Sequence, residues 1–518
     1  MHTFELILGM LATVAALVPL AERLSVPYPI VLVAGGLLLG FLPFVPDDVF
    51  KPEMLFVVVL PPLLYWDAVT TSWRDFHANA RPIGSLAIGL VVATTSGIAL
   101  VAHGWLGMPW ATSFGLGAIV SSTDAVAAGS IASRIGLSPR VVSILEGEGL
   151  VNDATALVVY AAAVGAAVQG SFSLPRAVLD FVLVSVGGIA VGLIAGWGVS
   201  CLRKPVTDIH VEGALALLTP FAAYLPAHAI GVSGVLAAVA AGLYVSRAAP
   251  TDVSAAVRLR AFAVGELGTF LLNGLTFVLI GLECQKLLGG IPGRSTPSLA
   301  ADAALVCLAV IAIRLLWVFP ATIIGRLSTG SDHLPAREIG VIGWAGMRGV
   351  IALATALALP STTDAGGFPD RELIIFITLA VIVVTLVGQG LTLPTLARSL
   401  RLDGGDLLER ETATARRAAT RAAIRRLDEL RDDGAASAEV LDETRKRYDR
   451  RRAAQADEPD AESEELLRDL RDVRLELIDV ERRALVALRD RGVIGDDALR
   501  HVMRELDLDT VRIDSATG

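Results

Sequence analysis

The chain has 518 residues, 53% of them hydrophobic, and a mean hydropathy of +0.61, well above the value for a soluble domain. This composition excludes an ordinary soluble protein. The net charge of −9 points to no nucleic-acid partner, and the three cysteines lack metal-ligand or disulfide spacing. Residues 401–518 carry 24 of the 44 Lys and Arg residues and 30 of the 53 Asp and Glu residues. The chain therefore divides into an apolar domain, residues 1–400, and a charged domain, residues 401–518.

Hydropathy predicts an all-α polytopic membrane protein. A window of about 19 residues gives about thirteen transmembrane helices in the first 400 residues. The predicted spans are 4–22, 28–45, 53–70, 82–104, 112–133, 141–168, 175–202, 209–229, 231–246, 258–282, 299–325, 339–360 and 371–396.

An odd number of spans places the two termini on opposite sides of the bilayer. If the N-terminus is outside, the inner connections carry 14 Lys and Arg residues, against five in the outer ones. Because cytoplasmic loops are enriched in Lys and Arg, we expect the N-terminus outside and the charged domain in the cytoplasm. The residues before the first span lack the basic cluster of a cleaved signal peptide, so this span is expected to remain.

Two of the predicted spans contain residues that interrupt a helix. Span 112–133 contains the polar run 121–124, whose side chains compete with helical hydrogen bonds, and span 339–360 contains the glycine-rich run 343–349. They are seven spans apart, so if the halves of the domain are repeats, one is inverted relative to the other. Inverted repeats with paired discontinuous helices occur in many secondary transporters, with the substrate site near the helix breaks.

Polar residues in span 141–168 are the strongest candidates for a functional site. Ionisable groups at this depth are costly and mark ion pathways. A hard cation prefers oxygen ligands, and the same buried carboxylate can bind a proton, so cation and proton would compete for one group, Asp153. The side chains expected to supply oxygen are those of Ser122, Thr123, Asp124, Asn152 and Asp153.

Two arginines lie in the interior of predicted spans, away from the span ends, and need partners. Arg314 is the lone basic residue of span 299–325, and Glu148 lies one helical turn before the Asn-Asp pair. We therefore expect a buried Glu148–Arg314 ion pair with a structural role, with Glu146 as the alternative partner. Arg348 lies in the break of span 339–360, where it can either satisfy carbonyl groups freed by the break or balance the charge of the site.

The motifs together resemble the monovalent cation/proton antiporter family, in its branch of bacterial sodium/proton exchangers, over about residues 5–400. Each motif alone is weak, but the combination is specific. The matching segments are 60–64 (Leu-Pro-Pro-Leu-Leu), 122–126 (Ser-Thr-Asp-Ala-Val), 148–153 (Glu-Gly-Leu-Val-Asn-Asp), 233–237 (Ser-Gly-Val-Leu-Ala), 277–281 (Phe-Val-Leu-Ile-Gly) and 346–350 (Gly-Met-Arg-Gly-Val).

This resemblance implies a thirteen-helix inverted-repeat fold, a homodimer, and an elevator-like alternating access in the bacterial plasma membrane. By motif position, Asp153 carries the cation and proton, Asp124 and the Thr123 carbonyl line the cation site, and Glu148 pairs with Arg314. The Asn-Asp pair resembles the electroneutral branch. The expected function is a secondary antiporter, not an enzyme, that exchanges Na⁺ for H⁺ in pH homeostasis without a cofactor; Li⁺ and K⁺ remain alternative substrates.

The sequence departs from the family pattern at two positions. Many members have proline after the Thr-Asp pair, where this chain has Ala125, so the break there is less strongly enforced. The acidic residue after the Leu-Pro-Pro segment usually stands where this chain has Trp66, one position before Asp67. We therefore leave Asp67 out of the predicted site.

Three other functions remain to be weighed. A potassium/proton antiporter would share every motif. A passive cation channel needs continuous access, whereas a titrating carboxylate beside broken helices fits alternating access. An intramembrane aspartyl protease could use Asp124 and Asp153, but neither lies in a Tyr-Asp or Gly-x-Gly-Asp segment that would resemble such enzymes.

The charged domain is predicted to form helices at 416–430, 440–452, 464–489 and 496–506, with a break at 455–460. Its clearest pattern is an apolar stripe at spacings of three and four, which is typical of an amphipathic helix. A regulatory or dimer-contacting module and a solvated appendage are both consistent with it. The stripe consists of Leu466, Leu470, Val473, Leu477 and Val480.

Overall fold

The computed structural model divides the chain into two compact units, which we call the membrane unit, Met1–Gly405, and the tail unit, Asp406–Gly518. Each is considered by itself. The structure describes residues 2–24, 26–42, 55–134, 137–169, 173–204, 206, 208–252, 255–287, 291, 294–328, 335–363, 366–400, 402, 405–432, 437–454, 461–491, 502–503, 506 and 508–510.

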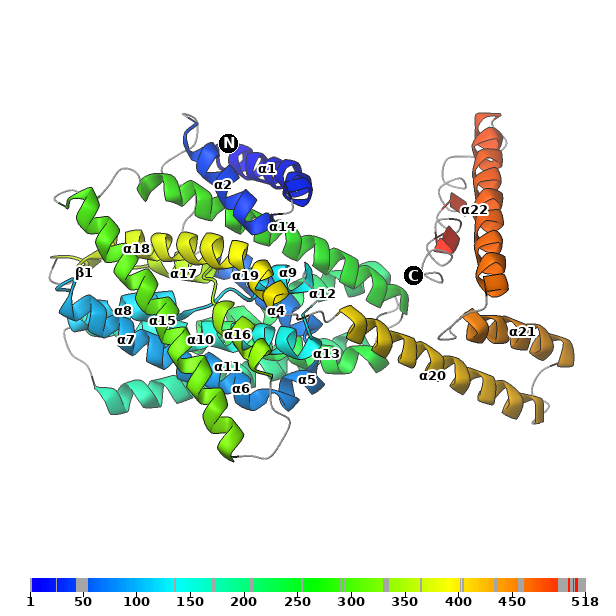
Figure 1. Ribbon diagram of the computed structural model, residues 1–518, viewed down its shortest axis with the longest axis horizontal. Coiled ribbons are helices and arrows are strands. Elements are labelled where there is room, and N and C mark those ends of the chain that lie inside the picture. Colours follow the sequence, from blue (N-terminus) through cyan, green and yellow to red (C-terminus); the bar gives the residue numbers. More distant parts are fainter. Residues whose placement is uncertain are drawn as a thin grey trace. The chain divides into compact units, whose positions relative to one another are not determined.

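The membrane unit is built of helices, which confirms the predicted all-α membrane fold (Figure 1). Its helices are α1 (His2–Leu24), α2 (Tyr28–Gly40), η1 (Leu55–Val59), α4 (Leu60–Thr70), α5 (Trp73–Ala78), α6 (Ala80–Gly84), η2 (Ser85–Leu90), α7 (Val91–Gly104), α8 (Trp110–Ser121), α9 (Ala125–Arg134), α10 (Pro139–Gln169), α11 (Leu174–Arg203), α12 (Ile209–Ala229), α13 (Gly234–Asp252), α14 (Ala255–Leu287), α15 (Thr296–Ser328), α16 (Ala336–Trp344), α17 (Val350–Leu357), α18 (Arg371–Val383), η3 (Val384–Gln389) and α19 (Gly390–Ser399).

Each predicted span falls on one of these helices or on a consecutive set of them. Among the described residues, seven helices are long and apolar enough to cross a bilayer, and three shorter apolar helices accompany them. The seven are 5–24, 80–104, 139–168, 175–203, 262–285, 296–320 and 371–399. The helices of the two interrupted spans are too short individually, because a continuous spanning helix needs about 20 residues.

Both predicted interruptions are present. Helix α8 ends at Ser121 and α9 begins at Ala125, while α16 ends at Trp344 and α17 begins at Val350. Residues 122–124 and 345–349 between them are not helical. The break after α8 therefore forms even without a proline at position 125.

One small element was not predicted. Strands β1 (Thr362–Thr363) and β2 (Gly366–Gly367) pair antiparallel between α17 and α18. Two residues per strand are too few to give a hydropathy signal, and they leave the fold class unchanged.

Glycines set the closest helix contacts of the membrane unit. Helix α14 packs along α2, and α1 packs against both, as Figure 1 shows at the blue end of the chain. A side chain at Gly36 of α2 would overlap the backbone carbonyl of Val278, and one at Gly281 of α14 would overlap that of Val33. Small residues let helix backbones approach closely in membranes, where packing replaces the hydrophobic effect as the source of association.

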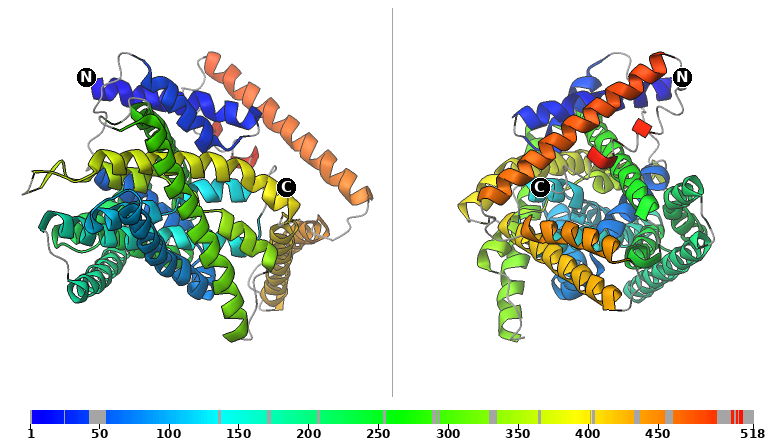
Figure 2. Two further views of the ribbon diagram at one scale, coloured as in Figure 1. Left: turned by 60° about the vertical axis from the view of Figure 1, so that its left-hand side comes forward. Right: turned by 90° about the vertical axis from the view of Figure 1, so that its right-hand side faces the viewer.

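The tail unit contains three long helices, α20 (Gly405–Asp432), α21 (Ala438–Ala454) and α22 (Ala461–Asp490). Ion pairs between Arg431 and Asp442 and between Arg445 and Asp428 join α20 to α21. Helix α22 is the long orange helix in Figure 2. The predicted break at 455–460 lies outside the described residues, as does most of the predicted helix 496–506.

Candidate functional site

The two breaks meet and exchange hydrogen bonds. In a continuous helix the amide of Asp124 would donate to the carbonyl of Val120. Here that amide donates to the carbonyl of Met347 in the other break at 2.8 Å, and the Val120 carbonyl accepts a bond from Arg348 Nε at 2.6 Å. Arg348 is fully buried and also donates to the carbonyl of Gly346 at 3.0 Å. Of the two roles considered for Arg348, its contacts show the first, satisfying freed carbonyls.

Asp124 caps the second half of its broken helix. Its Oδ1 atom accepts hydrogen bonds from the amides of Val126 at 2.9 Å and Ala127 at 3.0 Å. A carboxylate in this position satisfies unpaired amides and complements the positive end of the helix dipole. The carboxylate also lies against Gly349, where any added side chain would overlap it. The Asp124 carboxylate is thus enclosed by residues of both breaks.

Asp153 lies in the middle of α10 and faces the end of α8. Its side chain is 4% exposed, and its Oδ1 atom accepts a hydrogen bond from the Ser122 hydroxyl at 2.5 Å. Ser122 is the first residue after α8, so the break itself positions this donor. The structure therefore brings Ser122, Asp124 and Asp153 together.

A second polar chain leads from the break to the ion pair. The Asn152 amide donates to the Thr123 hydroxyl, which donates to Glu148 Oε1 at 3.0 Å. Arg314 binds both carboxylate oxygens of Glu148, at 2.5 and 2.8 Å, and both side chains are 2% exposed. Arg314 also donates to the Ile342 carbonyl at 3.0 Å, next to the break after α16.

This network holds the Asn152 amide group against the Thr123 hydroxyl. Successive residues of a helix point about 100° apart, so Asn152 and Asp153 face different sides of α10. Asp153 lines the cavity described below, whereas Asn152 does not. The Thr123 hydroxyl is likewise engaged with Glu148, and Thr123 also lines the cavity. Glu146, the alternative partner of Arg314, is half-buried elsewhere on α10.

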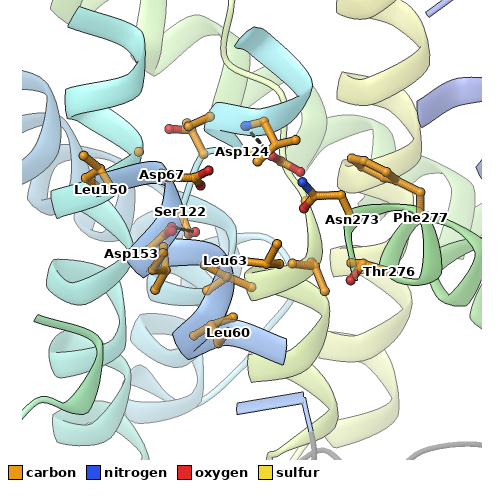
Figure 3. A pocket seen from close by; sticks show the side chains of 18 residues that line it. Leu60, Leu63, Asp67, Ser122, Asp124, Leu150, Asp153, Asn273, Thr276 and Phe277 are labelled. Atoms are coloured by element: carbon orange, nitrogen blue, oxygen red, sulfur yellow. Dashed lines mark hydrogen bonds between the residues drawn. The ribbon is translucent and has the colours of Figure 1, made fainter. Parts of the chain in front are cut away.

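A cavity of about 40 Å³ lies at the crossing of the breaks (Figure 3). Three carboxylates line it, because Asp67 of α4 joins Asp124 and Asp153. In Figure 3 Asp67, Asp153 and Ser122 lie on one side, and residues of α14 on the other. The full lining is Leu60, Leu63, Leu64, Asp67, Ser122, Thr123, Asp124, Ala125, Val126, Gly149, Leu150, Asp153, Asn273, Thr276, Phe277, Gly349, Val350 and Ile351.

Asp67 lines the cavity although it was not included in the predicted site. It was excluded because it stands one position after the acidic residue typical of the family. The useful signal was helical spacing: Leu60, Leu63 and Asp67 follow one another at three and four residues and so share a face of α4. That face lines the cavity.

Asn273 and Thr276 of α14 add polar atoms to the opposite wall. Asn273 is 9% exposed at the cavity, whereas Glu266, two helical turns earlier on the same helix, is exposed. The Thr276 hydroxyl donates to the Leu272 carbonyl at 2.8 Å. The sequence shows a polar residue in an apolar span, but it does not show which wall of the cavity that residue lines.

The arrangement suits a small cation and a proton. Carboxylate, hydroxyl and amide oxygens are the ligands of hard cations. A cavity of about 40 Å³ exceeds the roughly 10–15 Å³ that one water molecule needs. Leu60, Leu63 and Phe277 complete an apolar wall, and such a wall strengthens electrostatic interactions within the cavity.

Comparisons with known proteins show which chains this one is similar to. Residues 9–399 match the family described as sodium/hydrogen exchanger, transmembrane. An uncharacterized Na⁺/H⁺ exchanger of Mycobacterium tuberculosis is 36% identical over 520 residues, covering 98% of this chain and 95% of that protein. A sodium, potassium, lithium and rubidium/H⁺ antiporter of Bacillus subtilis is 30% identical over 513 residues, covering 95% and 75%. The sodium proton antiporter MjNhaP1 from Methanocaldococcus jannaschii has the same fold, with a TM-score of 0.64 at 22% identity, over 78% of this chain and 100% of that one.

Proposed function

The chain belongs to the transmembrane sodium/hydrogen exchanger family, and we propose that it exchanges one Na⁺ for one H⁺ across the bacterial plasma membrane. Cation/proton antiport by a multi-pass membrane protein is the activity of this family. The finer features of the proposal are the choice of Na⁺ over Li⁺ and K⁺, the electroneutral stoichiometry, the residues of the site, the homodimer, and the orientation.

One observation carries the assignment of the carrier residue. Asp153 is buried at the cavity and accepts a hydroxyl hydrogen bond, whereas Glu148 is compensated by both amino groups of Arg314. A carboxylate held by a guanidinium does not readily exchange that partner for Na⁺. Asp153 can release a proton and bind Na⁺ in its place, so the two ions exclude each other at one group.

The neighbouring residues support the carrier. Asp124 and the Thr123 carbonyl would complete the cation ligands from the break, with the Ser122 hydroxyl. Asp67 adds a third carboxyl group to the cavity wall, and negative charge in such a cavity raises the local concentration of cations. Asn152 acts from outside the cavity by holding the Thr123 side chain against Glu148.

Electroneutral exchange follows if Asp153 alone changes its proton in the cycle. Asn152 has no titrating group, Glu148 is held by Arg314, and Asp124 serves as a helix cap. One proton then leaves for each Na⁺ that binds. If Asp67 or Asp124 also released a proton in each cycle, two protons would move per cation and the transporter would carry current.

Alternating access is supported by the bonds between the breaks. The Asp124–Met347 and Arg348–Val120 hydrogen bonds tie the two discontinuous helices together, so they can move as one body with Asp153. The excess of Lys and Arg in the predicted inner connections supports an outside N-terminus and a cytoplasmic tail unit. Exposed apolar side chains along α11, including Val182, Val186 and Ile194, suit contact with lipid.

The test is transport by purified protein in proteoliposomes containing a pH-sensitive dye. An outward Na⁺ gradient should drive proton uptake, and a valinomycin-clamped membrane potential should leave its rate unchanged. Equal gradients of Li⁺ and K⁺ provide the selectivity arms, with K⁺ expected to be the weaker driver. Current without proton coupling would indicate a channel, and a rate that changes with the clamped potential would contradict one-for-one exchange.

A further inference from the structure

Helix α22 carries two apolar stripes, and the described part of the tail unit covers one of them. This covered stripe includes Leu475, Ile478 and Leu485, and Ile478 is 8% exposed. On the same side, Arg482 Nη2 donates to the hydroxyl of Thr510 at 3.0 Å. In Figure 1 the red C-terminal residues lie beside α22. The covered stripe is therefore part of the tail unit's own packing.

The second stripe, which we call the heptad stripe, is exposed within the tail unit. Its largest members, Val473, Leu477 and Val480, are 54%, 56% and 48% exposed. Alternating spacings of four and three residues are the pattern of a coiled-coil seam, and an exposed apolar seam of this length indicates a partner. The heptad stripe consists of Val473, Leu477, Val480, Ala484 and Ala487, and Leu466 and Leu470 continue its spacing in the sequence.

We propose that the heptad stripe pairs with the heptad stripe of a second copy of the chain, as an antiparallel two-stranded coiled coil. In the register centred between Ile478 and Asp479, Leu477 of one copy lies opposite Val480 of the other. Val473 then lies opposite Ala484. Each alanine meets a larger side chain, and such large-to-small pairing fills the space between helices evenly. Parallel pairing would set Ala484 against Ala484 and leave that end of the seam thinly packed.

The charges beside the seam favour the same arrangement. In antiparallel coiled coils, residues of like heptad position flank the seam opposite each other, and opposite charges there set partner choice and orientation. In the proposed register Arg474 faces Glu481 of the second copy, and Glu476 faces Arg483. Each contact occurs twice by symmetry. A parallel pair would instead set Glu476 against Glu481, which repel.

The coiled coil does not depend on the transport chemistry. It rests on the proposed homodimer in one respect. A seam of about three heptads is short, and it pairs more readily when two copies held in one membrane have a high effective concentration for each other. Pairing would then couple the two tail units of a dimer to each other.

Cysteine cross-linking in membranes tests the pairing on the full-length chain. The native Cys201, Cys284 and Cys307 are first replaced by serine, and retained exchange is verified. Differently tagged copies carrying Val473→Cys and Ala484→Cys are then co-expressed and oxidised. Positions 473 and 484 lie about 16 Å apart along a helix, beyond the reach of a disulfide. Antiparallel pairing therefore predicts a 473–484 cross-link at least about tenfold stronger than 473–473 or 484–484.

Two control variants sharpen the result. Asp479→Cys is exposed on the same helix but off the seam, and should give little cross-linking. Glu476→Arg should lower the 473–484 yield, because it meets Arg483 of the second copy, and adding Arg483→Glu should restore the yield. Parallel pairing predicts instead that Glu476→Arg raises the 473–473 yield, because the new arginine would meet Glu481 of the second copy.

The outcomes separate the two proposals. A dominant 473–473 cross-link overturns the antiparallel coiled coil, and so do cross-links from α22 to residues 1–405. Particles that are dimeric by light scattering but give no 473–484 cross-link overturn the coiled coil while leaving the homodimer intact. A 473–484 cross-link in membranes from a chain that is monomeric in detergent supports the coiled coil and contradicts a stable dimer through the membrane unit.

Discussion

Ion pairs between arginine and carboxylate occur in both units of the chain, but in opposite surroundings. In the membrane unit, Glu148 and Arg314 are each 2% exposed. In the tail unit, Arg431 and Asp442 are paired while their side chains are 50% and 59% exposed. Removing one partner of a buried pair strands the other charge away from water, whereas water already screens an exposed pair. The same chemistry therefore fixes helix positions in one unit and has little effect on stability in the other.

Asp153 differs from both kinds of paired carboxylate. It is as buried as Glu148, yet its hydrogen bond comes from the Ser122 hydroxyl and not from a guanidinium. A buried carboxylate with so little compensation is costly to the fold, and such groups in membranes are retained for function. The comparison thus separates charges that hold the structure from the charge that exchanges ions.

The largest effect is expected from Asp153→Asn. The change removes the group that both titrates and binds the cation, while its shape and the hydrogen bond from Ser122 can remain. Exchange in proteoliposomes should fall to background, with normal membrane insertion and a melting temperature in detergent no lower than that of the wild type. Retained Na⁺-driven proton flux in this variant would transfer the carrier role to another carboxylate, Asp67 or Asp124.

The next effect concerns stability. Glu148→Ala or Arg314→Ala strands the remaining charge, and breaking a buried pair from one side typically costs about 3–5 kcal/mol. Each single variant should melt at a clearly lower temperature in detergent, and the double variant should lose less than the sum of the two. Strictly additive losses would mean that the two side chains do not stabilise each other.

Gly349→Ala tests the contact between the two breaks. The added methyl group would overlap the Asp124 carboxylate and displace it from its helix cap, and loss of a cap costs about 0.5–2 kcal/mol. We expect a raised apparent Km for Na⁺ and a modestly lowered melting temperature. Gly115→Ala, in α8 with open space around it, is the matched control and should change neither. Wild-type Na⁺ affinity in Gly349→Ala would remove Asp124 from the cation site.

The smallest effect is expected in the tail unit. A double-mutant cycle on Arg431 and Asp442, using alanine, should give a coupling of about 0.2–1 kcal/mol. Hydrogen exchange of α20 and α21 measures it, and raising the salt concentration should reduce it further because exposed charges are screened. A coupling as large as that of Glu148 and Arg314 would erase the difference between the two units.

The sequence predicted the features that depend on local pattern. Apolar length located the spans, and polar or glycine-rich runs inside spans located both breaks. The lone Arg314 in an apolar span required a partner, and Glu148 was the carboxylate at suitable depth. The structure contains this ion pair.

Features that depend on how helices are rotated against each other could not be predicted in this way. Asn152 was predicted among the side chains that supply oxygen to the cation, and which partner its amide contacts, Thr123, depends on the rotation of α10. Arg348 reaches the Val120 carbonyl, more than 200 residues away in the chain. Asp67 required the helical face of α4 to be considered in place of a family position. Each of these depends on tertiary packing.

The most direct test of the account is competition between Na⁺ and H⁺ at Asp153. Initial rates of Na⁺-driven proton flux are measured in proteoliposomes over a series of Na⁺ concentrations at several pH values. Because both ions need one carboxylate, lowering the pH should raise the apparent Km for Na⁺ while the maximal rate stays nearly constant. A maximal rate that falls with pH at a constant apparent Km would contradict a shared site, since it would place the proton and the cation on separate groups.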